Sequence, residues 1–172
     1  MEPRIEIASI EPSDLKELTA VMTRAFDDDS RRHLGEERGG PEGYDDGSFL
    51  RRWCLHPAAR CYVARAQRAL VGAINVFPGA DGEGASVLGC MFVEPAAQRC
   101  GLGRSLWLHA QAAHPSRRWR LETPAWATSN HSFYERSCGF RKLRETDPRD
   151  PRENLFIYVW EAPSMACPER EA

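Results

Sequence analysis

The chain has 172 residues, of which 42% are hydrophobic and 28% are charged, so it is long enough for one substantial core and short for two. Its 23 basic and 25 acidic residues give a net charge of −2, without the basic excess that nonspecific nucleic-acid binding requires. Six cysteines show no CxxC pair and no metal-ligand spacing, and no window approaches the ~18 apolar residues of a membrane span. These observations predict a single domain with no metal, no nucleic-acid partner and no membrane contact, in a reducing cytoplasm.

The N-terminal part predicts a strand, a helix and a long loop. Apolar residues alternate within residues 4–10 as they do in a strand, and they recur at helical spacing over 15–26, where Phe26 closes the helix. Residues 27–46 hold eight acidic residues against three arginines, a net charge of −5, together with several glycines. We therefore expect this acidic segment to form no single regular element.

The middle of the chain has the pattern of a short helix followed by part of a sheet. Gly89, within the last of these predicted strands, marks a bulge or a close approach of another backbone. The predicted elements are a helix over 47–55, antiparallel strands over 60–66 and 70–77, a Gly-rich loop over 78–84 and a central strand over 85–93.

A turn over residues 98–103 follows the central strand and opens a helix over 102–113. The first N–H groups of a helix have no partner inside it and point outward at the positive end of the helix dipole, so they form an anion site. Gly101 and Gly103 let the backbone approach the anion without a side chain in the way. No Lys follows the second glycine and a third glycine is missing, so the turn is neither a Walker loop nor a dinucleotide fingerprint. It predicts a phosphate site.

The last part of the chain predicts a helix between strands. Asn130 is a suitable N-cap for this helix, and Gly139 a left-handed stop at its end. The predicted elements are a strand over 119–123, a helix over 130–138, two closing strands over 141–146 and 154–161, and a frayed tail over 162–172.

Two of these segments resemble one family. Val93, Pro95 and residues 98–103 look like the acyl-coenzyme A signature of the GNAT N-acetyltransferases, Q/RxxGxG/A after a Val or Ile strand. Residues 130–140, NHSFYERSCGF, are similar to the family's FYxxxGF segment and follow in the family's order and at its usual separation. The resemblance covers residues 4–161. It implies one GNAT-like domain over 1–161 and a flexible tail over 162–172. The implied fold is α/β of the α+β type: a mixed, mostly antiparallel sheet of about seven strands, flanked by about four helices, with a splayed parallel strand pair at its centre.

The resemblance also implies a function. It predicts an N-acetyltransferase that moves an acetyl group from acetyl-coenzyme A to a primary amine of a small molecule or peptide. The alternative is a GNAT-like module that senses acyl-coenzyme A without turnover. Dimers are common in the family, so a homodimer is a further expectation. The residues implied to bind the co-substrate are Met91, Phe92 and Val93 on the central strand, Gln98, Arg99, Cys100, Gly101, Leu102, Gly103, Arg104 and Ser105 at the turn, and Asn130.

The sequence shows no Ser, His and acid constellation and no GxSxG elbow, so direct attack by the substrate amine is simpler than a covalent intermediate. Deprotonation at pH 7 costs about 4.6 kcal/mol for an amine of pKa ~10.4 and about 1.4 kcal/mol for an α-amine near 8, so a base matters most for alkyl amines. Glu94 and Glu122, at the ends of their strands, are the candidate bases. Glu94 could instead face solvent, and Glu122 could make a structural pair. Of the two acids, Glu122 is favoured as the base. Its neighbours Leu121 and Pro124 indicate a less solvated setting, which would raise the pKa of its carboxyl group.

Tyr134 corresponds to the family's usual general acid, which protonates the departing thiolate. In the family this Tyr stands four residues before the Gly of GF, but here Gly139 follows five residues after Tyr134. Either the helix ends in a looser turn or the Tyr is rotated, and a core tyrosine is the structural alternative.

In the GNAT layout the place of residues 27–46 commonly walls the acceptor site. This segment is therefore either an acidic rim that attracts a cationic amine or a solvated surface loop, and charge alone favours the loop.

Overall fold

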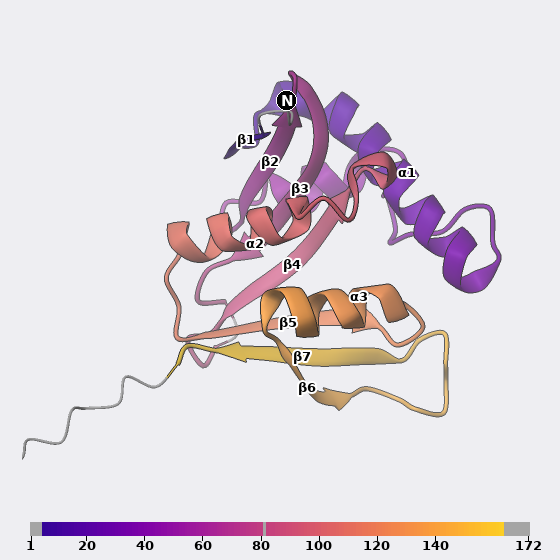
Figure 1. The fold of residues 1–172 in the computed structure, drawn as a ribbon, viewed down its shortest axis with the longest axis vertical. Coiled ribbons are helices and arrows are strands. Elements are labelled where there is room, and N and C mark those ends of the chain that lie inside the picture. The colour runs from indigo at the N-terminus through magenta and orange to yellow at the C-terminus, as the bar shows by residue number, and fades with distance from the viewer. Residues whose placement is uncertain (1–4, 81, 164–172) are drawn as a thin grey trace, which may run out of the picture.

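A seven-stranded sheet forms the centre of the computed structural model, which describes residues 5–80 and 82–163 (Figure 1). Its strands lie in the order β1-β2-β3-β4-β5-β7-β6, and every neighbouring pair is antiparallel except β4 and β5. The predicted sheet is therefore confirmed, while most of the predicted tail lies outside the described residues. The strands are β1 (Ile5–Ser9), β2 (Arg60–Ala66), β3 (Ala69–Phe77), β4 (Ser86–Val93), β5 (Arg118–Pro124), β6 (Arg141–Glu145) and β7 (Leu155–Glu161).

Four helices cover the two faces of the sheet, as predicted. On one face Leu106 and Trp107 of α2 pack with residues of β2 to β5 and of the segment after α3 in one core cluster. On the other face Leu18 and Met22 of α1 pack against β2 and β3 in a second cluster. The helices are α1 (Leu15–Leu34), a π-helical turn at Leu50–Cys54, α2 (Leu102–Ala113), and α3 (Thr128–Ser132), which continues as a π-helical turn at Phe133–Ser137. No helix in these described ranges has the length and apolar character needed to cross a bilayer.

α1 is longer than its apolar pattern predicted. It continues past Phe26 and ends at Gly35, whose φ of 68° is the left-handed conformation that closes many helices. Its added turns pair Asp28 with Arg32 and Asp29 with His33, four residues apart, and such pairs stabilise a helix. The prediction that Phe26 closes the helix was wrong, because a count of net charge hides opposite charges that lie on one helical face.

β4 and β5 are paired at one end only. Ser86 lies opposite Trp119 and Val87 opposite Arg120, and beyond these two pairs the strands diverge (Figure 1). The splayed parallel pair expected at the centre of the sheet is therefore present. We call the interruption of the backbone ladder between β4 and β5 the V; it is closed at Val87 and open toward the C-terminal ends of the two strands.

Gly89 forms the bulge that the sequence predicted. Asn75 of β3 lies opposite Cys90 and Val76 opposite Leu88, so Gly89 is an extra residue in β4. A Cβ atom on Gly89 would lie 2.8 Å from the Phe77 ring, so a side chain has no room there.

α3 begins earlier than predicted. Its first residue is Thr128 and Asn130 lies inside it, so Asn130 is not the N-cap. The Asn130 side chain instead donates a hydrogen bond to Thr123 Oγ1 of β5 at 3.3 Å, which ties the helix to the strand. Gly139, with a φ of 77°, has the predicted left-handed conformation after the helical segment.

Candidate active site

The strand β4 turns backbone groups of Met91 and Val93 toward the V. Glu94 N–H donates to Val71 O at 2.8 Å, and partners alternate along an antiparallel pair, so Met91 and Val93 direct their backbone groups away from β3. Gln98 Nε2 donates to Val93 O at 3.1 Å, which agrees with this direction. Phe92 was also expected to bind the co-substrate, but its backbone faces Ala73 of β3 and its side chain is buried.

The turn after β4 has the geometry of an anion site. Ser105 N–H donates to Gly101 O at 3.0 Å, which is the first helical hydrogen bond of α2. The amides of Leu102, Gly103 and Arg104 therefore have no acceptor inside the helix. Gly101 has a φ of 79° and nothing within 4 Å of where its Cβ would be, so the turn opens to solvent. Ser105 was predicted to bind the co-substrate, but its amide already donates to Gly101 O. Its hydroxyl donates to the same oxygen at 3.2 Å.

Arginine side chains and hydrogen bonds surround this turn. Arg99 and Arg104 are exposed, and the φ of Arg99, 62°, is a conformation that few non-glycine residues adopt. The neighbouring Cys100 is also exposed. Gln98 Oε1 accepts a hydrogen bond from Arg32 of α1 at 2.9 Å, so the turn is fixed to both β4 and α1.

The sequence indicated that Gly103 keeps side chains away from the bound anion, but in the structure this glycine has a packing role. A Cβ atom on Gly103 would lie 3.0 Å from Cζ of Phe133. The missing side chain therefore lets α2 pack closely against the segment that carries Tyr134, and Gly101 alone provides the open approach to the turn.

Tyr134 lies in the π-helical turn that follows α3. Its ring packs edge-on against Phe133 at 5.3 Å and Phe140 at 6.0 Å, and its side chain is buried. Burial raises the pKa of Tyr134, and nearby Cys90, Cys138 and Asp29 raise it further. Its hydroxyl makes no hydrogen bond with any residue in the described part of the chain. The site therefore holds a neutral phenol with a free donor.

The extra residue between Tyr134 and Gly139 is accommodated by this π-helical turn. Phe140 N–H donates to Tyr134 O at 3.0 Å, closing a wider turn than an α-helix makes. A π-helical turn holds an additional residue without moving the elements on either side, and it is frequent at functional sites. Of the two alternatives left by the sequence, the looser turn is the one found.

Glu94 lies at the open end of the V, but its carboxylate is occupied. Arg24 of α1 binds it with Nε at 2.9 and 3.0 Å and with a terminal guanidinium nitrogen at 2.6 Å. Because both carboxylate oxygens accept charged hydrogen bonds, Glu94 forms a structural link between β4 and α1.

Glu122 lies outside the expected cleft. Leu121 and Thr123 of β5 are buried toward the α2 and α3 face, so Glu122 points to the opposite face. Its side chain is 51% exposed and lies 3.6 Å from Arg120. The expectation of a less wet setting was wrong, because alternation along the strand places Glu122 on the solvent side.

The structure brings together three polar residues that the sequence analysis did not connect. His33 Nε2 of α1 lies 3.3 Å from Asp29 Oδ1 and 2.9 Å from Ser129 Oγ of α3. The His33 ring also lies 6.1 Å from the Trp126 ring. The only sequence signal was the four-residue spacing of Asp29 and His33, which has meaning once residues 27–34 are helical. A Ser, His and acid cluster therefore exists, contrary to the sequence analysis.

The remaining acids of the segment 27–46 are largely paired. Asp28 forms an ion pair with Arg32, Asp45 lies 2.6 Å from Arg38, and Glu36 lies 2.7 Å from Arg152. Tyr44 and the Gly39 amide donate to Asp27 Oδ1 at 2.7 and 3.2 Å, which folds the loop back on α1. Asp28 and Asp45 are thus paired within the segment, and Arg152 adds one positive charge from outside it at Glu36.

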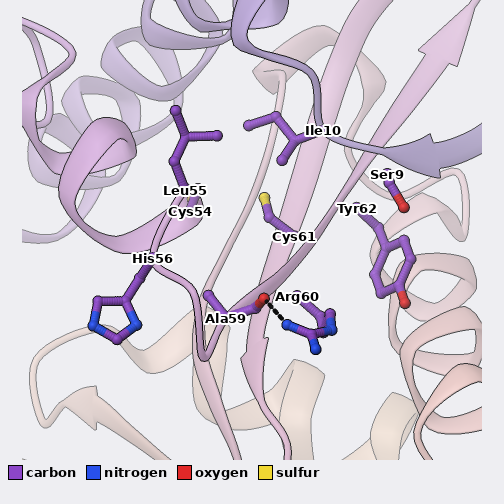
Figure 2. Close-up of a pocket in the computed structure, with 9 residues that line it drawn as sticks. All are labelled: Ser9, Ile10, Cys54, Leu55, His56, Ala59, Arg60, Cys61 and Tyr62. Atoms are coloured by element: carbon purple, nitrogen blue, oxygen red, sulfur yellow. Dashed lines mark hydrogen bonds between the residues drawn. The ribbon is translucent and has the colours of Figure 1, made fainter.

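A hollow at the other end of the sheet is separate from this site (Figure 2). It lies at the start of β2, beside the closed end of the V, and Cys54 and Cys61 line it. Hydrogen bonding with Cys54 and burial raise the pKa of the Cys61 thiol, so a reactive thiolate is disfavoured there. The described residues contain no group of three metal-ligating side chains.

Comparisons with known proteins agree with this architecture. The chain matches the family model of the acetyltransferase (GNAT) family over residues 20–140. Its fold is similar to that of an acetyltransferase from Thermus thermophilus, with 21% identity, a TM-score of 0.68 and coverage of 92% of this chain and 97% of that one.

Two further solved structures show the same fold. The PaiA N-acetyltransferase from Thermoplasma acidophilum, in complex with coenzyme A, has 18% identity, a TM-score of 0.72 and coverage of 92% and 99% of the two chains. The ribosomal-protein-S18-alanine N-acetyltransferase from Escherichia coli has 18% identity, a TM-score of 0.65 and coverage of 98% and 100%. A search of curated proteins gave no match. Because the family model spans most of the sequence and the fold agrees throughout, this chain belongs to the acetyltransferase (GNAT) family.

Proposed function

We propose that the protein is an N-acetyltransferase that transfers the acetyl group of acetyl-coenzyme A to a primary amine of a small molecule or peptide by direct attack. The observation that carries this proposal is the convergence of three features on the V. They are the outward backbone groups of Met91 and Val93, the free amides at the start of α2, and the buried Tyr134 hydroxyl.

Each feature has a role in holding the co-substrate, which supplies the acetyl thioester. The amides of Leu102 to Arg104 bind the pyrophosphate, and Arg99 and Arg104 add positive charge. The backbone of Met91 and Val93 pairs with the pantetheine arm. Binding of coenzyme A by the PaiA neighbour supports this assignment.

Tyr134 stabilises the thiolate that leaves. Its raised pKa keeps the phenol protonated at neutral pH, so it donates a hydrogen bond to the sulfur as negative charge develops there. Of the two bases that the sequence indicated, Glu94 is paired with Arg24 and Glu122 is exposed on the opposite face of β5, so the structure favours neither. We also propose that the enzyme works in a reducing cytoplasm, which is supported by the five free cysteines of the described residues.

The test is a screen of amines with acetyl-coenzyme A that measures release of free thiol. The panel contains putrescine, spermidine and a peptide with an N-terminal alanine. We expect thiol release with at least one amine. Binding of acetyl-coenzyme A by calorimetry without thiol release would favour the alternative, a non-catalytic sensing module, and absence of binding would exclude both.

A further inference from the structure

The last turns of α1 are tied to the start of α3 across the open end of the V. His33 Nε2 contacts Asp29 Oδ1 at 3.3 Å on its own helix and Ser129 Oγ at 2.9 Å on α3. α1 belongs to one face of the sheet and Tyr134 to the core of the other. Arg32 of α1 donates to Gln98, which is itself bonded to Val93 O of β4. Asn130 of α3 donates to Thr123 of β5, so the contact between His33 and Ser129 spans the open end of the V.

The geometry of the cluster identifies which of its members accepts a proton. In a nucleophile triad, the acid and the serine bind different nitrogens of the histidine ring. Here the same nitrogen, His33 Nε2, faces both Asp29 and Ser129. A proton on this nitrogen is directed at the Asp29 and Ser129 oxygens, and the nitrogen does not activate the hydroxyl. Ser129 also lowers the pKa of Asp29. Asp29 and Ser129 therefore share one ring nitrogen, and Ser129 is not arranged as a nucleophile.

The surroundings of Asp29 make it a better proton acceptor than an ordinary carboxylate. Its side chain is 20% exposed. Burial raises the pKa of Asp29 and Asp28 raises it further, while His33, Arg32 and Ser129 lower it. These titratable and polar groups lie on α1 and α3.

We propose that Asp29 takes the proton from the acceptor amine, and that His33 and Ser129 are positioning residues that hold its carboxylate at the open end of the V. This inference rests on the proposed acetyl transfer. One proton of the ammonium moves to an Asp29 oxygen, and the neutral nitrogen forms a bond to the thioester carbon. The carbon–sulfur bond then breaks, and Tyr134 hydrogen-bonds the leaving sulfur. The nitrogen loses a second proton, the thiolate gains one, and Asp29 releases the first proton to solvent. The products are the amide, free coenzyme A thiol and one released proton.

Asp29 fits this role better than the acids that the sequence indicated. Glu94 gives both oxygens to Arg24, and Glu122 lies on the solvent face of β5. Asp29 is more buried than Glu122, at 20% against 51% exposed, and it contacts one histidine nitrogen at 3.3 Å rather than a bidentate arginine.

The experiment compares pH profiles of kcat/KM for wild type, Asp29→Asn, Glu94→Gln and Glu122→Gln, using the best alkyl amine from the panel. At pH 7 about one in 2,500 molecules of an amine with pKa ~10.4 is neutral, against about one in ten for an amine with pKa ~8. We therefore expect Asp29→Asn to lower kcat/KM about 100-fold for the alkyl amine, and less for the alanine peptide. The pH profile of kcat/KM should lose its rise on the acidic side in Asp29→Asn and keep it in wild type, Glu94→Gln and Glu122→Gln.

Two further variants separate proton acceptance from a structural role. Ser129 lowers the pKa of Asp29, so the acidic limb should move to higher pH in Ser129→Ala. Asp14→Asn is the matched control, because it removes another buried carboxylate, paired with Arg65, at the start of the same helix. It should lower Tm and leave the pH profile unchanged.

The outcomes distinguish this inference from the function on which it rests. Absence of thiol release with every amine in wild type overturns the acetyl transfer and the inference with it. Thiol release whose acidic limb persists in Asp29→Asn, or disappears in Glu94→Gln or Glu122→Gln instead, overturns only the role of Asp29. An equal loss of activity at every pH in Asp29→Asn also overturns it, because that result indicates a structural effect.

Discussion

Replacing Tyr134 by Phe removes one hydroxyl and separates catalysis from stability. The hydroxyl has no hydrogen-bond partner in the described part of the chain and the side chain is buried, so the change breaks no protein hydrogen bond. We expect the Tm of Tyr134→Phe to stay within about 1 °C of wild type, or to rise slightly. Turnover should fall about 100-fold, with little change in acetyl-coenzyme A affinity, because the hydroxyl acts only as the thiolate forms.

The pKa values of donor and acceptor decide how the hydroxyl acts. A phenol of pKa ~10 lies above a thiol of ~8.5, so complete proton transfer is uphill by about 2 kcal/mol at ordinary values. Burial raises the pKa of Tyr134 and makes the transfer less favourable still. The hydroxyl therefore contributes chiefly a hydrogen bond to the developing charge, and a 100-fold loss corresponds to about 2.7 kcal/mol.

Tyr158 is the matched control within the same core. Its hydroxyl donates to Glu135 Oε1 at 2.8 Å, and its side chain is 1% exposed. Because Glu135 can be hydrated after the hydrogen bond is lost, Tyr158→Phe should cost about 1 kcal/mol, or about 2–4 °C in Tm. Turnover per folded molecule should not change. The assays are thermal unfolding and initial-rate kinetics on one established acceptor. Wild-type turnover in Tyr134→Phe would refute the catalytic role and show that Tyr134 is purely structural.

Three further predictions concern the turn, its packing and the acceptor. Gly101→Val should weaken acetyl-coenzyme A binding by calorimetry at least tenfold, because a β-branched residue is strained at a φ of 79°, whereas Gly79→Val, at a φ of 65° with equally open surroundings, should leave affinity unchanged. Gly103→Ala should lower the free energy of unfolding by about 1–3 kcal/mol, because its Cβ would lie 3.0 Å from the Phe133 ring, and an unchanged Tm would contradict that close packing. If the segment 27–46 lines the acceptor entrance, kcat/KM for a cationic amine should exceed that for a neutral analogue by only a few-fold at low salt and fall as salt rises, because three of its eight acids are paired with arginines and the Debye length is ~8 Å at physiological ionic strength. A preference that is indifferent to salt would leave this segment as solvated surface.

Local patterns predicted most of the fold. Apolar alternation located all the strands to within a few residues, and the single extra residue at Gly89 was visible because a glycine inside a strand often marks a bulge. The end of α1 was missed because Asp28, Asp29, Arg32 and His33 count as charge in a sequence window, while their stabilising effect depends on spacing around a helix.

The site was harder to predict than the fold, for a physical reason in each case. Free amides at the start of α2 follow from local geometry, so the turn was predictable. The face on which Glu122 points depends on the register of β5 within the sheet, and a shift of one residue reverses it. The contact between His33 and Ser129 joins residues 96 positions apart, and no local pattern contains it.

The V has a consequence for how the molecule holds together. Only two residue pairs connect the backbone ladder of β1 to β4 with that of β5 to β7, so strand hydrogen bonding alone would leave two weakly coupled subsheets. Trp107 of α2 packs 5.1 Å from Trp119 and 5.0 Å from Phe140, within a cluster that also includes residues of β2, β3 and β4. Cooperative unfolding of the whole domain thus depends on aromatic packing behind the sheet, which leaves the edges of β4 and β5 free to exchange their amide hydrogens without opening the core.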